Sequence, residues 1–290
     1  MSGQNFKVAT LTMDIEGTRE NNFRIAGQLI DEAAQEWGVK MVCLPELFMA
    51  RMPDRSTTKQ DMLRVAEPIP GGPSVGMLAD KAKQHGIYIV GGTIVELAKG
   101  EVLYETCPFI GPDGKLLGKV SYCYTKMNTA IKYKIGSGIS MAPEEEYGPR
   151  VFETPLGRIG IVAGEDRSSL KAQEKIKSGK PDVVFNVANV RARTTQRVIR
   201  LLSELYAGGC LSYVVFSNVH GFRKNVKDFG DILYDGTSAI LNSGGLIIAQ
   251  TTVSTMRPYE WMAVAMIDLK LLDKIRENVA NRDNAVAVPW

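Results

Sequence analysis

The chain has 290 residues, of which 44% are hydrophobic and 23% are charged, and its formal net charge is +3. This composition predicts a globular protein with a sizeable core. The nearly balanced charge argues against nucleic acid or an acidic membrane surface as a partner. No apolar run approaches the roughly 20 residues of a membrane-spanning helix, and the first residues lack the features of a signal peptide. We therefore expect a cytoplasmic protein.

Cysteine and histidine are too sparse for a metal site. No CxxC pair is present, which argues against zinc and against a disulfide framework, so reduced and mostly buried thiols are expected. His85 and His220 are the only histidines and form no cluster. There is no P-loop, and the glycine pairs fit turns. We expect neither a metal nor an organic cofactor. The four thiols belong to Cys43, Cys107, Cys123 and Cys210.

Strands and helices are predicted to alternate through the first half of the chain, because hydrophobic residues recur first at period 2 and then at helical spacing. The expected elements are a strand at 7–13, a helix at 20–37, a buried strand at 39–44, a helix from the PGGPSVG segment to about His85, and strands at 86–96, 102–110 and 115–124.

The second half repeats this alternation but contains more hairpins. The charged clusters Arg191–Arg193 and Lys224–Lys227 are predicted to be solvated loops. The expected elements are a hairpin of 151–154 with 157–163, a helix at 168–178, a strand at 182–188, a helix at 194–208, a strand at 212–218, a hairpin in 236–250, a strand at 261–269 and a helix at 269–278.

Strands that alternate with helices predict an α/β fold, and the adjacent hairpins predict mixed rather than purely parallel sheets. No linker interrupts the chain, so we expect one domain over residues 1–290 with a short carboxyl-terminal tail from about 271. Ligands of such sheets bind beyond the carboxyl ends of strands. The candidates at such ends are Glu46, Lys126 and the Gly164–Asp166 turn.

Four segments in order give these positions a meaning. LPELF (44–48), GRIGIVAGED (157–166), YDGTSAILNSGG (234–245) and the PGGPSVG-to-GIYIVGG stretch resemble the nitrilase (carbon–nitrogen hydrolase) superfamily over about residues 7–270. The resemblance implies a four-layer αββα sandwich and a homodimer or higher even-numbered homo-oligomer. It also implies amide or nitrile hydrolysis by a cysteine thiolate, with a glutamate as base and a lysine that stabilises the oxyanion.

The residues at the implied catalytic positions depart from this pattern. Glu46 matches the glutamate, but the Cys-Tyr-Asp of the superfamily reads Gly164-Glu165-Asp166. Glycine has no side chain, so a covalent acyl intermediate is not available at position 164, and the vacated volume is expected to admit a bulkier ligand. The resemblance gives Asp166 a structural role. Glu165 is expected to point into the pocket, where its charge and that of Glu46 raise a carboxylate pKa.

Two alignments compete for the lysine position. Counting without a gap places Tyr122 there, whereas a four-residue insertion places Lys126 there. If the strand is regular to Lys126, both side chains share one face with Tyr124, and Cys123 points the other way. The second glutamate of many superfamily members has no counterpart in the 128–141 segment.

Two functional interpretations follow, and a third remains open. The first is an enzyme with altered, non-thiolate acid–base chemistry on a small polar amide- or amine-containing metabolite. It would use Glu46 and Lys126, with Glu165 or Tyr122 as further candidates. The second is a catalytically silent homologue that binds a metabolite or partner. The third is an engineered, inactive variant of an ordinary carbon–nitrogen hydrolase.

Overall fold

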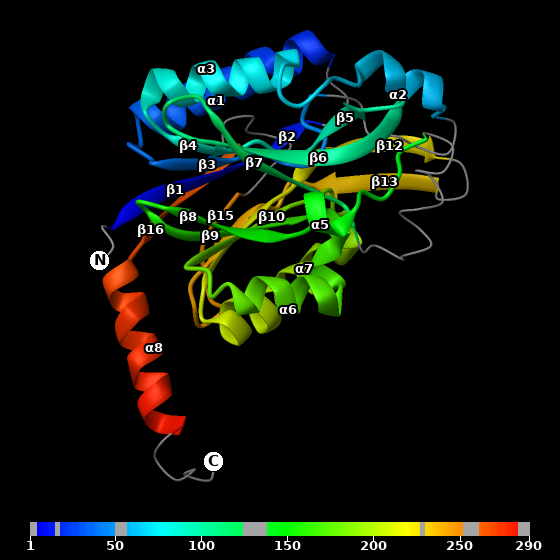
Figure 1. Ribbon diagram of the computed structural model, residues 1–290. Coiled ribbons are helices and arrows are strands. Elements are labelled where there is room, and N and C mark those ends of the chain that lie inside the picture. Colours follow the sequence, from blue (N-terminus) through cyan, green and yellow to red (C-terminus); the bar gives the residue numbers. More distant parts are fainter. Residues whose placement is uncertain are drawn as a thin grey trace.

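The computed structural model describes residues 5–14, 18–49, 57–123, 138–226, 230–251 and 261–283. Helices cover the outer faces of two sheets that pack against each other, which gives the layers α, β, β, α (Figure 1). Both sheets mix parallel and antiparallel pairs, as the hairpins between the helices predicted. The predicted α/β sandwich with mixed sheets is therefore confirmed.

The first sheet has seven strands in the order β16-β1-β3-β4-β6-β5, with β7 paired to β6. Apolar residues of α1 and α3 pack on its outer face. The predicted strand at 86–96 is two strands, because Gly92 has a φ of +64° and turns the chain between them. The elements are β1 Phe6–Leu11, α1 Arg19–Gln35, β3 Met41–Cys43, α3 Pro73–His85, β4 Tyr88–Val90, β5 Ile94–Ala98, β6 Val102–Ile110, β7 Leu116–Ser121 and β16 Met262–Ile267.

The second sheet has six strands in the order β15-β14-β11-β10-β9-β8. Helices α6 and α7 cover its outer face (Figure 1). The predicted helix at 194–208 begins earlier and passes into a π-helical turn at Ser203–Gly208. The elements are β8 Arg150–Thr154, β9 Gly157–Ala163, a 3-10 helix Gly164–Ser168, α6 Leu170–Ser178, β10 Val183–Val187, α7 Ala192–Leu202, β11 Tyr213–Ser217, β14 Ala239–Leu241 and β15 Ile247–Gln250.

Successive side chains of the central strands point alternately into two hydrophobic cores, one between the sheets and one between the second sheet and its helices. In β10, Val183, Phe185 and Val187 point between the sheets, whereas Val184 packs toward the helices with Phe216 of β11. This alternation explains why β10 is apolar on both faces, as strands covered on both sides are.

Five further elements lie outside the predicted pattern. β2 (Met13–Asp14), β12 (Val219–Val226) and β13 (Gly230–Asp235) form a separate three-stranded sheet, and the short helices α2 (Lys59–Val65) and α5 (Glu144–Tyr147) precede β4 and β8 in the chain. The expectation that the Lys224–Lys227 cluster is a loop is wrong for Lys224, which lies in β12. The charged residues made this segment look like a loop in the sequence, because one face of β12, including Phe222, is exposed to solvent and tolerates charge.

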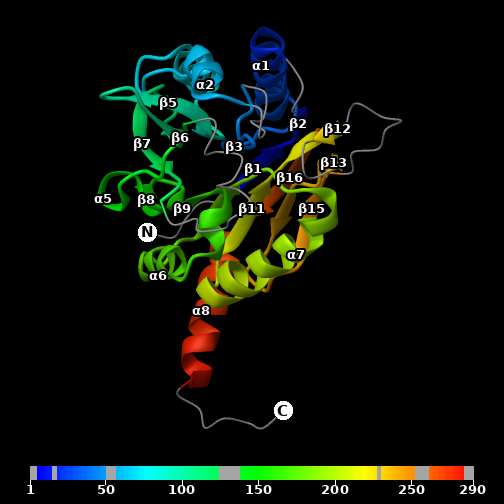
Figure 2. The same ribbon diagram turned by 90° about the vertical axis from the view of Figure 1, so that its right-hand side faces the viewer.

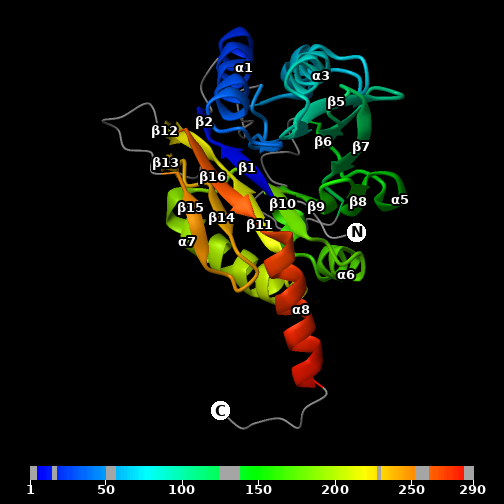
Figure 3. The same ribbon diagram turned by 90° about the vertical axis from the view of Figure 1, so that its left-hand side faces the viewer.

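The carboxyl-terminal helix α8 (Leu269–Asp283) projects away from the layers (Figures 2 and 3). It is longer than the predicted helix at 269–278. Leu269 and Leu272 anchor its first turns in the core, and Arg276 donates to Asp182 at 2.5 Å and to the carbonyl of Pro181 at 2.6 Å. Within the described ranges, no helix combines the length and apolarity that crossing a bilayer requires.

Candidate active site

The carboxylate of Glu46 lies where the two sheets meet at the carboxyl ends of their strands. Pro45 ends the segment that follows β3, and the backbone N–H of Glu46 donates to the carbonyl of Ala188, just beyond β10, at 3.4 Å. Only 2% of Glu46 is exposed. The strand ends on both sheets therefore converge on this side chain, as binding sites of α/β sheets do.

Among the described residues, the side chains of Tyr122 and Asn189 donate hydrogen bonds to the Glu46 carboxylate. The hydroxyl of Tyr122 donates to Oε2 at 2.6 Å, and the side-chain amide of Asn189 donates to Oε1. A buried carboxylate is tolerable when donors replace its lost hydration. The arrangement gives the centre an acceptor, Glu46, in direct contact with a phenolic donor.

The residue that follows Glu46 has an unusual backbone conformation. Leu47 has a φ of +51°, in the left-handed region that disfavours β-carbon-bearing residues. Its N–H donates to the hydroxyl of Thr93 at 2.9 Å, and this hydroxyl donates to the carboxylate of Glu105 at 2.8 Å. The surrounding structure holds this strained turn in place, which is typical of functional sites.

Gly164 lies directly after β9, beside the same strand ends, and has a φ of +39°. A β-carbon built on Gly164 would lie 1.4 Å from the hydroxyl oxygen of Tyr122 and 2.0 Å from its Cζ. The expectation of a vacated volume that admits a bulkier ligand is therefore wrong. The Tyr122 side chain fills the space that a side chain at position 164 would enter.

The environment of Tyr122 keeps its hydroxyl protonated. Burial raises its pKa well above the ordinary value, and the negative charges of Glu46, Glu105 and Glu165 raise it further. The group is therefore a hydrogen-bond donor rather than a resident phenolate.

This pKa shift predicts an alkaline loss of stability. A tyrosine whose pKa is raised by folding makes its full contribution to the free energy of unfolding at pH values below its unfolded pKa of about 10. This contribution is lost as the pH rises through the folded pKa. Between the two values the slope is about 1.4 kcal/mol per pH unit. Other buried groups, such as Tyr206, also have raised pKa values, so we expect Tyr122→Phe to reduce the total alkaline slope by about this amount in urea unfolding measured from pH 8 to 11. An unchanged slope would contradict a raised Tyr122 pKa.

The two acidic residues after Gly164 play different parts. Asp166 is fully buried, and one of its carboxylate oxygens accepts the backbone N–H of Cys123 at 2.6 Å, so it ties the 164–168 turn to the segment after β7. Glu165 accepts from Arg167 at 2.6 Å. Its carboxylate is thus paired with a cation rather than left as a second bare charge beside Glu46.

Arg167 holds the turn from within. Only 3% of its side chain is exposed. Its guanidinium donates to the carbonyl of Gly164 at 2.7 Å and to the carboxylate of Glu165. The hydroxyl of Tyr206 donates to the Arg167 carbonyl at 3.0 Å. The conformation of Gly164 is therefore fixed by a buried polar network.

Of the two candidates for the lysine position, Tyr122 reaches the centre and Lys126 lies outside the described residues, as does Tyr124. β7 ends at Ser121, before the predicted strand end at 124, so the condition on which the shared face of Tyr122, Tyr124 and Lys126 depended is not met. Cys123 follows the strand end, and burial together with the charge of Asp166 raises its thiol pKa to about 12. Such a thiol is a poor nucleophile at neutral pH.

Three residues of this centre escaped the sequence-based prediction. Glu105 is a fully buried carboxylate in a largely apolar strand, and a charge in such a strand is itself a signal. Asn189 follows the end of the buried strand β10 by two residues, and a place just beyond a buried strand is also what singled out Glu46. Arg167 gave no signal, because only the fold shows that it is buried.

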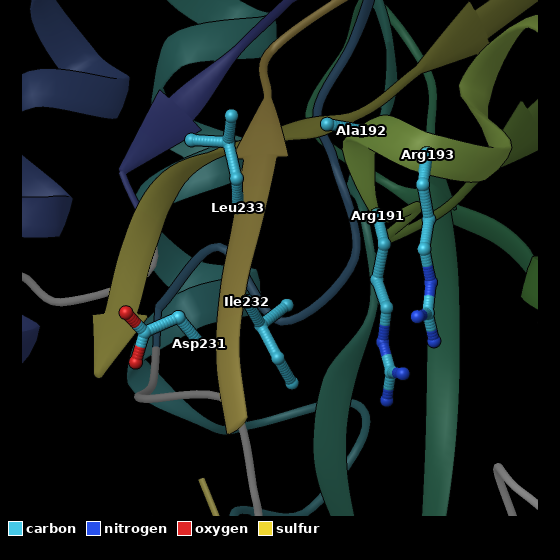
Figure 4. A pocket seen from close by; sticks show the side chains of 6 residues that line it. All are labelled: Arg191, Ala192, Arg193, Asp231, Ile232 and Leu233. Carbon is cyan, nitrogen blue, oxygen red and sulfur yellow. The ribbon is translucent and has the colours of Figure 1, made fainter. Parts of the chain in front are cut away.

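A pocket of about 200 Å³ lies between the start of α7 and β13. The side chains of Arg191 and Arg193 extend in the same direction along β13, whereas Asp231 projects from the other side of that strand (Figure 4). The expectation that Arg191–Arg193 is a solvated loop is therefore wrong, since these residues begin α7 and line a pocket. Within the described ranges, no group of three or more His, Cys, Asp or Glu side chains could hold a metal ion.

Comparison with known proteins agrees with this architecture. The sequence profile of the carbon-nitrogen hydrolase family matches residues 7–277. Omega-amidase NIT2-A of Xenopus laevis is 34% identical over 279 residues, 96% of this chain and 94% of that protein. Omega-amidase NIT2 of Homo sapiens is 32% identical over 276 residues, 94% and 92% of the two chains. The chain belongs to the carbon–nitrogen hydrolase family, within the nitrilase superfamily.

Solved structures share the fold. Nit3 of Saccharomyces cerevisiae has a TM-score of 0.78 at 20% identity and covers 95% of this chain and 94% of its own. A carbon-nitrogen hydrolase of Helicobacter pylori G27 has a TM-score of 0.82 at 14% identity, with coverage of 95% and 93%.

Proposed function

We propose that this family member performs acid–base chemistry without a thiolate on a small polar amide- or amine-containing metabolite, with Glu46 as base and Tyr122 as acid. The observation that carries the proposal is the 2.6 Å hydrogen bond between the Tyr122 hydroxyl and Glu46, beside the side-chain-free position 164. A covalent acyl–enzyme step is not part of it, because Gly164 offers no nucleophile.

The pair has the properties that general acid–base catalysis requires. A protonated phenol and a carboxylate are in direct contact, so the carboxylate accepts a proton from a substrate N–H or water while the phenol donates to a developing negative charge. The similarity to omega-amidases supports an amide-containing ligand. We also propose Lys126 and Glu165 as catalytic residues of this site, with Asp166 in a structural role beside them.

One observation favours a second function, a catalytically silent homologue that binds a metabolite or partner. Glu46 and Tyr122 are both almost fully buried, with 2% and 5% exposed, and they already satisfy each other. A site built for stability rather than turnover would have this closed geometry. The interpretation as an engineered variant receives less support. Replacing a cysteine by glycine alone would leave a cavity, whereas in this chain the Tyr122 side chain fills that space.

Turnover by variants separates the two functions. We expect wild-type protein, incubated with a panel of amides, ureas, nitriles and amino-acid conjugates, to consume one of them in a mass-spectrometric assay. Glu46→Gln and Tyr122→Phe should abolish that turnover, whereas Glu36→Gln, an exposed control on α1's carboxyl end, should not. Tight binding without turnover, unaffected by Glu46→Gln, would instead favour the silent homologue.

The assembly, the location and the domain organisation remain proposals. We propose a cytoplasmic homodimer or higher even-numbered homo-oligomer, one domain over residues 1–290, and no metal or organic cofactor. Light scattering coupled to size exclusion checks the assembly, and an odd-numbered or monomeric species would contradict it.

A further inference from the structure

We propose that Tyr122 and Gly164 are a sterically coupled pair: the phenol ring of Tyr122, rather than the missing thiol alone, closes the nucleophile position. The inference goes beyond the proposed function, because it holds whether the centre is catalytic or silent. It makes Tyr122 the residue that determines whether any side chain or ligand can enter the space between Gly164 and Glu46.

The distances leave no alternative placement for both side chains. Real β-carbons essentially never approach a non-bonded heavy atom within 3.0 Å, yet a β-carbon at position 164 meets the hydroxyl oxygen of Tyr122 at 1.4 Å and two of its ring carbons at 2.0 and 2.6 Å. The obstacle is a ring, not the far end of a flexible chain. Aromatic side chains in a packed interior do not move aside by such distances without local repacking.

The ring is also held at its far end. Its hydroxyl donates to Glu46 at 2.6 Å, and Glu46 is fixed in turn by the amide of Asn189 and by its own N–H bond to Ala188. A side chain added at position 164 would therefore displace the ring and leave a buried carboxylate with one donor fewer. The position is closed by packing and by hydrogen bonding together.

The left-handed backbone of Gly164 adds a separate penalty that the test must isolate. Gly86 is a matched control, because its φ of +61° is also left-handed and a β-carbon there meets nothing within 4 Å. Gly86→Cys thus measures the backbone strain of a cysteine without a clash.

The experiment is a double-mutant cycle with thermal unfolding and thiol mapping. We expect Gly164→Cys in the wild-type background to lower the Tm well beyond Gly86→Cys. In the Tyr122→Ala background, Gly164→Cys should lower the Tm by no more than Gly86→Cys does. The Tm loss caused by Gly164→Cys should therefore differ by about 3 °C or more between the two backgrounds. Iodoacetamide should alkylate the thiol at position 164, identified by peptide mass, in the double variant and not in the single one.

Tyr122→Phe distinguishes the ring from the hydroxyl. Since the ring remains, Gly164→Cys should stay as costly in this background as in the wild type. If the single variant does not fold while Tyr122→Ala/Gly164→Cys does, the coupling is shown in its strongest form. Equal Tm losses in all three backgrounds, or equal labelling in the single and double variants, would overturn the proposal. If a variant with Gly164→Cys misfolds, the same Tm measurements are repeated with Gly164→Ala in its place. None of these readouts depends on turnover.

Discussion

Arg167→Met should destabilise the protein by about 3 kcal/mol, because it removes a buried cation together with the two hydrogen bonds that this cation donates. The guanidinium binds the carbonyl of Gly164 and the carboxylate of Glu165, and only 3% of its side chain is exposed. Methionine preserves much of the volume, so the loss reports the polar network rather than a cavity. Urea unfolding at pH 7 measures it.

Arg200→Met is the matched control for this prediction. Arg200 also pairs with a glutamate, Glu204, at 2.8 Å, but both side chains are largely exposed, at 81% and 61%. Exposed pairs contribute little, so the change in unfolding free energy should be under about 0.5 kcal/mol. If the two variants lost equal stability, Arg167 would not be the support of the Gly164 turn.

Phe185→Ala should cost about 3–5 kcal/mol, the range for removing a fully buried aromatic side chain. Phe185 lies at the centre of β10, between the two sheets, and none of it is exposed. The interior cannot collapse around the lost ring, because strands on both sides hold it in register. The urea midpoint should fall accordingly, without a large change in the slope of the transition.

Phe222→Ala provides the comparison on the small sheet. Phe222 is also a phenylalanine in a strand, but 48% of it is exposed. Surface substitutions of this kind usually change stability by about 0.5 kcal/mol or less. A large loss at Phe222 together with a small one at Phe185 would mean that the core between the sheets is not the main source of stability.

The packing around Gly164 changes how the proposed alignment of position 164 can be tested. Restoring a cysteine by Gly164→Cys alone puts a side chain into the volume that Tyr122 occupies. The absence of amidase activity in that variant would therefore say little about the alignment. The informative variant also shortens Tyr122, and it asks whether Glu46 then has a thiol beside it.

The sequence by itself determined the elements whose signal is local. Strand 102–110 appears at its predicted bounds as β6, and the apolar strand that ends at Cys43 delivers Glu46 to the site as the Pro45 break indicated. The α/β class and mixed sheets follow from the same period-2 and helical patterns. Local patterns suffice here because each of these elements buries its own apolar face.

The tertiary structure alone decided what surrounds Glu46. Tyr122 and Gly164 are 42 positions apart, and only the packing of the two sheets shows that they compete for one volume. The three-stranded sheet and the roles of Glu105, Asn189 and Arg167 were likewise decided by contacts between distant segments. Sequence patterns report which face of an element is buried, but which side chains meet across that face depends on how the sheets pack.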